Sequence, residues 1–169
     1  MVRRYRGRPR ISNRDKYSVE HTVCVTPSSN DWTNVAATET TQASDQFHYT
    51  VVPPTTTEGM RKVKHITLSF SANGEAGPPL LYALVFVPQG YIPNYIHYPL
   101  LGDPGSLYEP NQFVMSCGVL DFSGGPLRIR CPLSRNLNSG DSIHLVLADP
   151  DQGTSVSYTI NATYAITLQ

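Results

Sequence analysis

Short runs of β-branched and aromatic residues follow one another along the chain, and each run is bounded by glycine, proline or small polar residues. Fourteen prolines and twelve glycines occur in 169 residues, and no apolar period of three to four residues lasts long enough to predict a helix. Runs of this kind are typical of β-strands. The pattern predicts eight strands, at Val19–Thr26, Phe47–Val52, Lys62–Ser71, Leu80–Val87, Phe113–Leu120, Pro126–Cys131, Ser142–Ala148 and Ser155–Leu168.

Two of these runs alternate between apolar and polar residues, which predicts half-buried strands because successive side chains point to opposite faces. The last strand is expected to carry Val156, Tyr158, Ile160, Ala162, Tyr164, Ile166 and Leu168 on one face. In the strand at Lys62–Ser71, we expect one face to carry Val63, His65, Thr67 and Ser69, and the other Lys64, Ile66, Leu68 and Phe70.

The run LLYALVFV, Leu80–Val87, is apolar on both faces. A strand of this kind should be covered on both sides. In a domain with no predicted helix, a second sheet would cover one face and a neighbouring subunit the other. The run therefore points to assembly.

Eight antiparallel strands in about 150 residues predict two packed sheets, as in a β-sandwich or a jelly roll. Two connections are unusually long for a compact domain, Pro27–Gln46 and Gln89–Gln112, and loops of that length usually have a function. The second is rich in tyrosine and apolar residues. It is expected either to cover a neighbour or ligand, or to fold back over its own sheet.

The charges divide the chain into two parts. Residues 1–16 carry seven basic groups and one acid, a net +6, and residues 17–169 carry six basic and twelve acidic groups, a net −6. Such asymmetry is typical of a basic arm on a mildly acidic body, and it favours a nucleic-acid partner. The alternatives are a solvated tail or a nuclear-import signal alone. We therefore predict a disordered arm at 1–16 and a single β domain at 17–169.

Two further features bear on the partners of the body. Charged residues make up only 15% of the chain, against about 25% for a typical soluble domain, which favours surfaces hidden against other subunits. The basic groups Arg61, Lys62 and Lys64 cluster at the start of one predicted strand, and Arg128 and Arg130 alternate on another. If they face the same side as the arm, they would extend a phosphate-binding surface; otherwise they are ordinary surface charges.

The residues suited to catalysis or metal binding form no recognisable site. The five histidines are scattered, and none has the close spacing of a metal-binding pair. The three cysteines, Cys24, Cys117 and Cys131, are expected to be buried thiols. There is no nucleophile motif and no phosphate-binding glycine loop. We predict no enzyme activity, no catalytic residue, no metal and no cofactor, and no apolar segment predicts a membrane span or a secretory leader.

Three stretches resemble the capsid proteins of circular Rep-encoding single-stranded DNA (CRESS-DNA) viruses, of which circoviruses are the best-known members. They are LYALVFVPQG at Leu81–Gly90, SLYEPNQFVMSCGV at Ser106–Val119 and PLSRNLNSGDSIHLVL at Pro132–Leu147. The resemblance extends over about Lys62–Gln169 and the arm. It implies an all-β, eight-stranded antiparallel jelly roll, sixty copies of which form a T=1 icosahedral shell around single-stranded DNA.

The same resemblance gives the arm its expected role. It implies DNA binding inside the virion and entry into the host nucleus, with host import factors and a host receptor as further partners. Tyr5 would stack on a base. This arm is shorter than the arginine-rich arms common among circoviruses, so inner-face residues would share the task. The expected nucleic-acid-binding residues are Arg3, Arg4, Tyr5, Arg6, Arg8, Arg10, Arg14 and Lys16.

Two other functions remain open at this point. Arg6-Gly7-Arg8-Pro9 is similar to an AT-hook, in which arginines beside a glycine enter a narrow minor groove. The chain would then be a DNA-binding regulator. Alternatively, it would be a non-viral β-sandwich that binds carbohydrate or protein.

Overall fold

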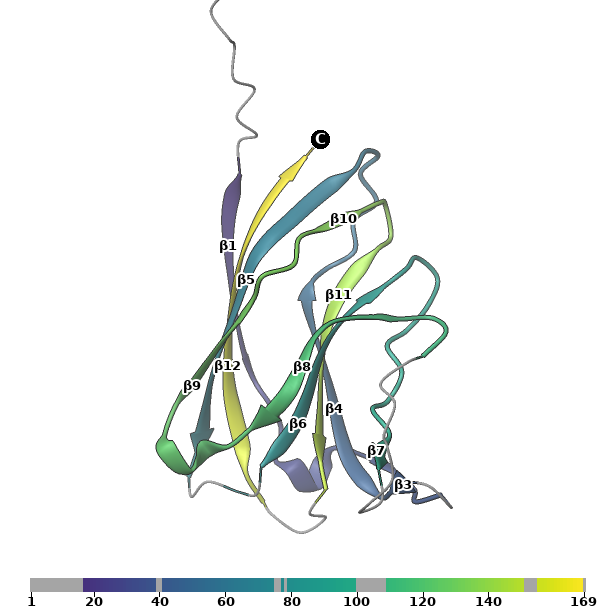
Figure 1. The fold of residues 1–169 in the computed structure, drawn as a ribbon. Helices are drawn as coiled ribbons and strands as arrows, with labels where there is room; N and C mark the ends of the chain where they lie inside the picture. The colour runs from purple at the N-terminus through teal and green to yellow at the C-terminus, as the bar shows by residue number, and fades with distance from the viewer. Residues whose placement is uncertain are drawn as a thin grey trace, which may run out of the picture.

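A computed structural model describes residues 17–38, 41–74, 77, 79–99, 109–150 and 155–168. Its strands form two large antiparallel sheets and one small one (Figure 1). The first sheet has the order β1-β12-β5, and β9 and β10 both pair with β5; its strands are β1 (Ser18–Val25), β12 (Ser157–Leu168), β5 (Arg61–Asn73), β9 (Leu127–Cys131) and β10 (Arg135–Leu137).

The second sheet has the order β2-β4-β11-β6-β8. Its strands are β2 (Thr33–Val35), β4 (Ser44–Val52), β11 (Ser142–Asp149), β6 (Leu80–Val87) and β8 (Phe113–Leu120). The small sheet pairs β3 (Thr41–Gln42) with β7 (Tyr98–Pro99), and two short 3-10 helices, η1 (Ser29–Asp31) and η2 (Phe122–Gly124), lie in connections.

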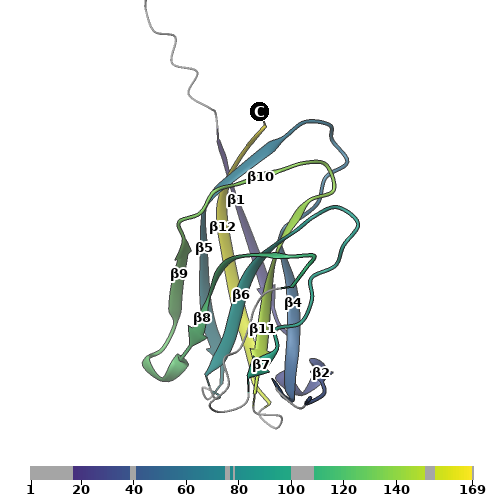
Figure 2. The same cartoon turned by 45° about the vertical axis from the view of Figure 1, so that its right-hand side comes forward.

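The path of the chain between the two large sheets makes this an all-β jelly roll. The chain runs from β1 in the first sheet to β4 in the second, returns to β5, crosses to β6 and β8, returns to β9, crosses to β11 and ends in β12. These eight strands are the predicted eight, with bounds that differ by a few residues. Figure 2 shows the two sheets packed face to face.

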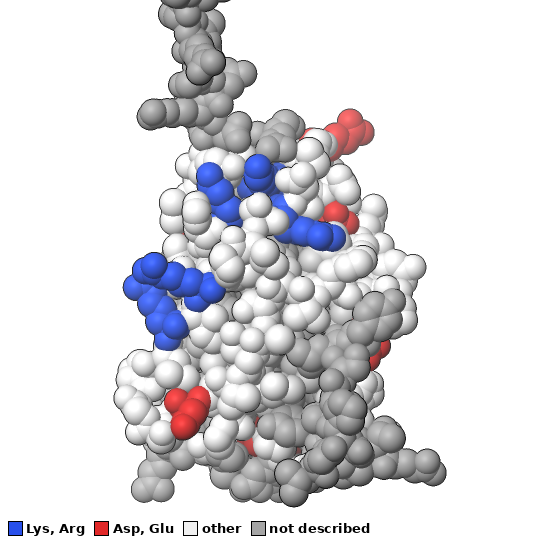
Figure 3. Space-filling model, viewed as in Figure 1, with Lys and Arg blue, Asp and Glu red and all other residues white. Residues whose placement is uncertain are grey.

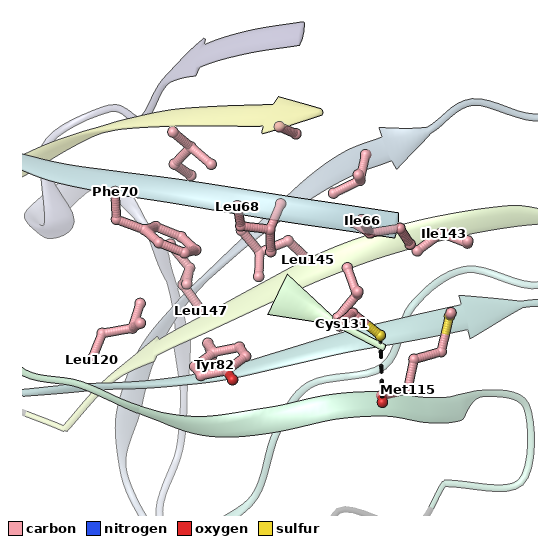
Figure 4. Close-up of a cluster of buried hydrophobic side chains, with 14 of the residues drawn as sticks. Ile66, Leu68, Phe70, Tyr82, Met115, Leu120, Cys131, Ile143, Leu145 and Leu147 are labelled. Atoms are coloured by element: carbon pink, nitrogen blue, oxygen red, sulfur yellow. Dashed lines mark hydrogen bonds between the residues drawn. The ribbon is translucent and has the colours of Figure 1, made fainter. Parts of the chain in front are cut away.

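The core lies between the sheets and is built from the inward-facing residues of both. Leu68 and Phe70 of β5 meet Leu145 and Leu147 of β11 (Figure 4). These side chains are at most 2% exposed. Trp32, from the first long connection, also enters the core, with its ring centroid 5.6 Å from that of Phe47. The first long connection therefore packs against the core of the same domain.

The predicted alternation in β5 is wrong on one side of His65. Val63 and Ile66 are both buried, and His65 is exposed with φ of 56°. The register on β12 shifts at this point, so that an extra residue of β5 is accommodated. A β-bulge of this kind reverses the phase of the side chains. Lys64 therefore faces outward with Thr67 and Ser69, while Val63 joins the core.

The prediction that a neighbouring subunit covers the outer face of β6 is also wrong where the structure describes that face. Ile96, from the second long connection, is 2% exposed and packs on Val85 and Val146 in a second apolar cluster. The side-chain amide of Gln46 accepts a hydrogen bond from Ile96 N at 2.8 Å and donates to Ile96 O. The connection therefore folds back over its own sheet at residues 91–97.

The cysteines are only partly as expected. Cys131 is buried, and its thiol donates to Met115 O at 3.7 Å (Figure 4); burial raises the pKa of this thiol. Cys24 is half-buried, and Cys117 is exposed on β8. The prediction of three buried thiols is wrong for Cys117, because it lies on the outward phase of an edge strand.

Candidate nucleic-acid interface

The residues predicted to bind nucleic acid all lie outside the described residues. They are Arg3, Arg4, Tyr5, Arg6, Arg8, Arg10, Arg14 and Lys16. The first described residue, Tyr17, marks the point at which the arm joins the jelly roll. The described residues that surround this point form the candidate interface.

Every lysine and arginine after residue 16 lies on β5, β9 or β10 of the first sheet. Four of the six point outward. Lys62 and Lys64 do so because their neighbours Arg61 and Val63 are buried, and Arg128 and Arg130 because Leu127 and Ile129 pack on the core. We call Lys62, Lys64, Arg128 and Arg130 the basic face. Figure 3 shows lysine and arginine side chains in two groups on this side of the molecule, with uncharged surface between them.

Small hydroxyl side chains lie next to the arginines of the basic face. Arg130 pairs with Thr67, and Arg128 with Ser69. Short neighbours leave both guanidinium groups exposed and free to reach outward. The strands β5, β9, β10 and β12 contain no aspartate or glutamate. The positive potential of this face is therefore not cancelled by acids on its own strands, and it would attract phosphates without reading sequence.

The arm joins the sheet beside the basic face. The ammonium group of Lys64 lies 3.4 Å from the ring centroid of Tyr17, a cation–π contact. Ser18 then pairs with Ile166 of β12, and Ile166 pairs with Val63 of β5 on its other side. The sequence left open whether the basic residues of the body share a side with the arm. The structure brings Lys62 and Lys64 to the position where the arm begins.

The other two basic residues of the body have different surroundings. Arg61 is 9% exposed and donates to the carbonyl oxygens of Pro53 and Asp141 at 3.1 and 3.2 Å. Burial lowers the pKa of its guanidinium group. Arg135 faces the opening between the sheets, 4.2 Å from the ring centroid of Phe86. Arg61 is thus a structural residue, and Arg135 belongs to a separate pocket.

The opposite margin of the first sheet is apolar. On the edge strand β1, Val19, Val23 and Val25 are 69%, 56% and 61% exposed. Because β1 lies at the edge of the sheet, no described strand pairs with one row of its backbone groups. Edges of this kind pair readily with other chains unless they are covered.

Replacing Arg128 and Arg130 by glutamine should weaken the binding of single-stranded DNA and lower its dependence on salt. Each lost phosphate contact removes about 0.7 from the slope of log K against log salt for a single strand, so the double variant should lose about 1.4. The measurement is the affinity of the full chain for a thymidine oligonucleotide at several salt concentrations. The control, lysine at both positions, keeps the charge and should keep the slope; an unchanged slope in the glutamine variant would exclude the basic face.

The structure also brings together two histidines that sequence spacing did not connect. His48 on β4 and His144 on β11 lie on adjacent strands, and both line a pocket of about 390 Å³ beneath residues 92–95. His144 Nδ1 lies 3.2 Å from Thr50 Oγ1 and Nε2 2.9 Å from Ser142 Oγ. The His48 and Tyr95 rings are 5.0 Å apart. No local motif could have shown this pair, because strand register creates it.

The environment of this pair favours neutral imidazoles. Burial lowers the pKa of His48. Burial, and secondly the charge of His48, lowers the pKa of His144 to about 4. The Nε2 atom of His48 is buried and has no hydrogen-bond partner within the described part of the chain. Protonation of either ring would therefore place a poorly solvated charge beneath the 91–97 segment.

The free energy of unfolding should fall as pH falls from 6.5 to 4. In this window the unfolded chain binds a proton on His144 at its ordinary pKa, and the folded chain does not, so protons favour unfolding. After allowance for the partly exposed ring, the effect is about 2 kcal/mol. Urea unfolding at a series of pH values measures it. His144→Gln should flatten the pH dependence of the free energy of unfolding, whereas the exposed-site control His21→Gln should not. Parallel curves for the wild-type protein and both variants would contradict the assignment of this dependence to His144.

The described residues contain no group of three histidine, cysteine or acidic side chains that could hold a metal ion. None of their helices has the length and apolar character needed to cross a membrane.

Comparison with known proteins returned no matching family model and no curated protein of significant similarity.

Proposed function

We propose that this chain is a capsid subunit of the CRESS-DNA virus type. Sixty copies would form a T=1 shell around single-stranded DNA, with the arm and the basic face on the inside. The observation that carries the proposal is the position of the basic face: on a jelly-roll body, its cations lie on one sheet, and Lys64 lies against Tyr17, where the arm joins that sheet. The subunit would act in the virion and, during assembly, in the host nucleus, without catalysis.

Two features support self-association. The chain has few charges, and two edge strands of the jelly roll expose apolar side chains: Val19, Val23 and Val25 on β1, and Phe113 and Val119 on β8. Interface cores are depleted in charge and enriched in aromatic residues. Contacts between subunits would cover these edges. Repetition of the arm and the basic face around one cavity would then give many weak phosphate contacts the strength of multivalent binding.

Expression of the full chain followed by negative-stain electron microscopy tests the proposal, with absorbance at 260 and 280 nm read on the same fraction. Uniform spherical particles with a high 260/280 ratio are the expected result. A small monodisperse species at every salt and pH would contradict it. Titration with AT-rich and GC-rich duplexes would then separate an AT-hook regulator, which prefers AT, from a β-sandwich binding module.

A further inference from the structure

The structure assigns a phosphate-binding pocket to the end of the sandwich where β10 meets β6. The pocket has a volume of about 500 Å³ and is lined by Lys62, Phe86, Ser134, Arg135, Asn136, Asn138 and Asp141. Its ligand would be a phosphate group, either of a nucleic-acid backbone or free. The assignment of a phosphate ligand rests on the pocket itself. Only the identification of packaged single-stranded DNA as the source of that phosphate rests on the proposed function.

Arg135 is held in place by aromatic rings rather than by an acid. Its guanidinium carbon lies 4.2 Å from the ring centroid of Phe86 and 5.2 Å from that of Phe113. Stacking fixes the plane of a guanidinium group and leaves its N–H donors available at its edge. The side chain of Arg135 makes no hydrogen bond or ion pair with any described residue. It therefore presents a planar set of donors, the geometry that binds phosphate oxygens in pairs.

Lys62 supplies a second cation from the adjacent strand. It pairs in register with Asn136, the residue after Arg135, and it also lacks an ion-pair partner among the described residues. The side chains of Ser134, Asn136 and Asn138 make no hydrogen bond within the same part of the chain. Two cations and three neutral side chains that can donate thus meet in one pocket. A phosphate group, with up to two charges and several acceptor oxygens, fits this set better than a carboxylate does.

The acid in the pocket does not neutralise these cations. One carboxylate oxygen of Asp141 accepts from Gln89 N at 3.0 Å, and the other accepts from Asn138 N at 2.8 Å. Asp141 is 5% exposed, and its carboxylate forms no ion pair with Lys62 or Arg135 in the described residues. It holds the turn at 138–141, in which Gly140 has φ of +82° and an added Cβ would clash with the side chain of Gln89. The acid therefore shapes one wall of the pocket.

Thermal unfolding of the full chain with added inorganic phosphate, at constant ionic strength, tests the assignment. A ligand that binds only the folded state raises Tm in proportion to its occupancy. Phosphate should raise Tm, and acetate should not. Lys62→Gln and Arg135→Gln should each weaken the apparent affinity at least tenfold. His21→Gln, which changes an exposed side chain on β1 outside both the pocket and the basic face, should leave it unchanged. Lys62 is half-exposed, so its variant keeps the test valid if the Arg135 variant unfolds.

Each alternative result has a definite meaning. Equal stabilisation by acetate would overturn the phosphate assignment in favour of a carboxylate, such as that of a neighbouring chain. Equal affinity in the Lys62→Gln and wild-type proteins would show general ion effects and would also overturn it.

A second ligand, a 5′-phosphorylated thymidine dinucleotide, identifies the source of the phosphate. It is added to the full chain in which the seven basic residues of the segment 1–16 are replaced by glutamine. Binding that still depends on Lys62 assigns the pocket to a nucleic-acid backbone, whereas a response to inorganic phosphate alone assigns it to the free ion. This binding measurement does not require assembled particles. Failure of the capsid proposal can therefore be distinguished from failure of the pocket assignment.

Discussion

Particles formed by a chain that lacks residues 1–16 should contain only a small fraction of the nucleic acid found in particles of the full chain, while the shell still forms. The deletion removes a net charge of +6 from every subunit and ends immediately before Tyr17 and β1. The jelly roll therefore keeps its strands and loses the segment that we propose makes most of the phosphate contacts. The measurement is the 260/280 ratio of purified particles, with extraction and quantification of the nucleic acid.

Two full-length variants separate charge from chain length. Replacing the seven basic residues of the arm by glutamine should lower the nucleic acid content as far as the deletion does. Changing only the six arginines to lysine should retain most of it, because binding through counterion release depends on charge. Particles that are equally rich in nucleic acid after the deletion would contradict the packaging role of the arm. They would indicate that the basic face binds the packaged nucleic acid instead.

The second large effect is expected from the core. Leu145→Ala should lower the free energy of unfolding by about 3–4 kcal/mol, the range for a leucine deleted from a rigid core. Leu145 is 0% exposed on β11, a strand with neighbours on both sides, and it faces β5 across the sandwich. Urea unfolding of dissociated subunits measures the loss. Trp32 is the only tryptophan and is 6% exposed, so its fluorescence reports the transition.

The matched control is Val23→Ala on β1. Val23 is 56% exposed, so its truncation should change the stability of the dissociated subunit by less than about 0.5 kcal/mol. A loss below about 1 kcal/mol for Leu145→Ala would contradict the placement of the core. If the Val23 variant also weakens particle formation, β1 contributes to subunit contacts.

The strands were predictable because their signals are local. Alternation placed Tyr158, Ile160 and Ala162 on one face of β12, and all three are buried. Turn residues marked where strands end: the carboxylate of Asp121 accepts from Ser123 N before β9, and Gly140 adopts a positive φ before β11. The error in β5 came from the bulge at His65, because a single added residue reverses every side chain on one side of it.

The candidate sites were less predictable because residues from distant strands form them. The pairing of Arg130 with Thr67 and of Lys62 with Asn136 depends on strand register. So does the meeting of His48 with His144. No pattern in the sequence marked Arg135, since its partners Phe86 and Phe113 lie on the other sheet.

By itself, the sequence determined the all-β class, the eight main strands, and the division into a basic segment and an acidic body. These follow from side-chain periodicity, turn chemistry and charge, which act over neighbouring residues. Only the tertiary structure decided which strands pair, that Ile96 covers β6, and that Lys62 and Lys64 lie where the arm begins. Those outcomes depend on how two sheets bury their apolar faces together, and that packing brings together residues far apart along the chain.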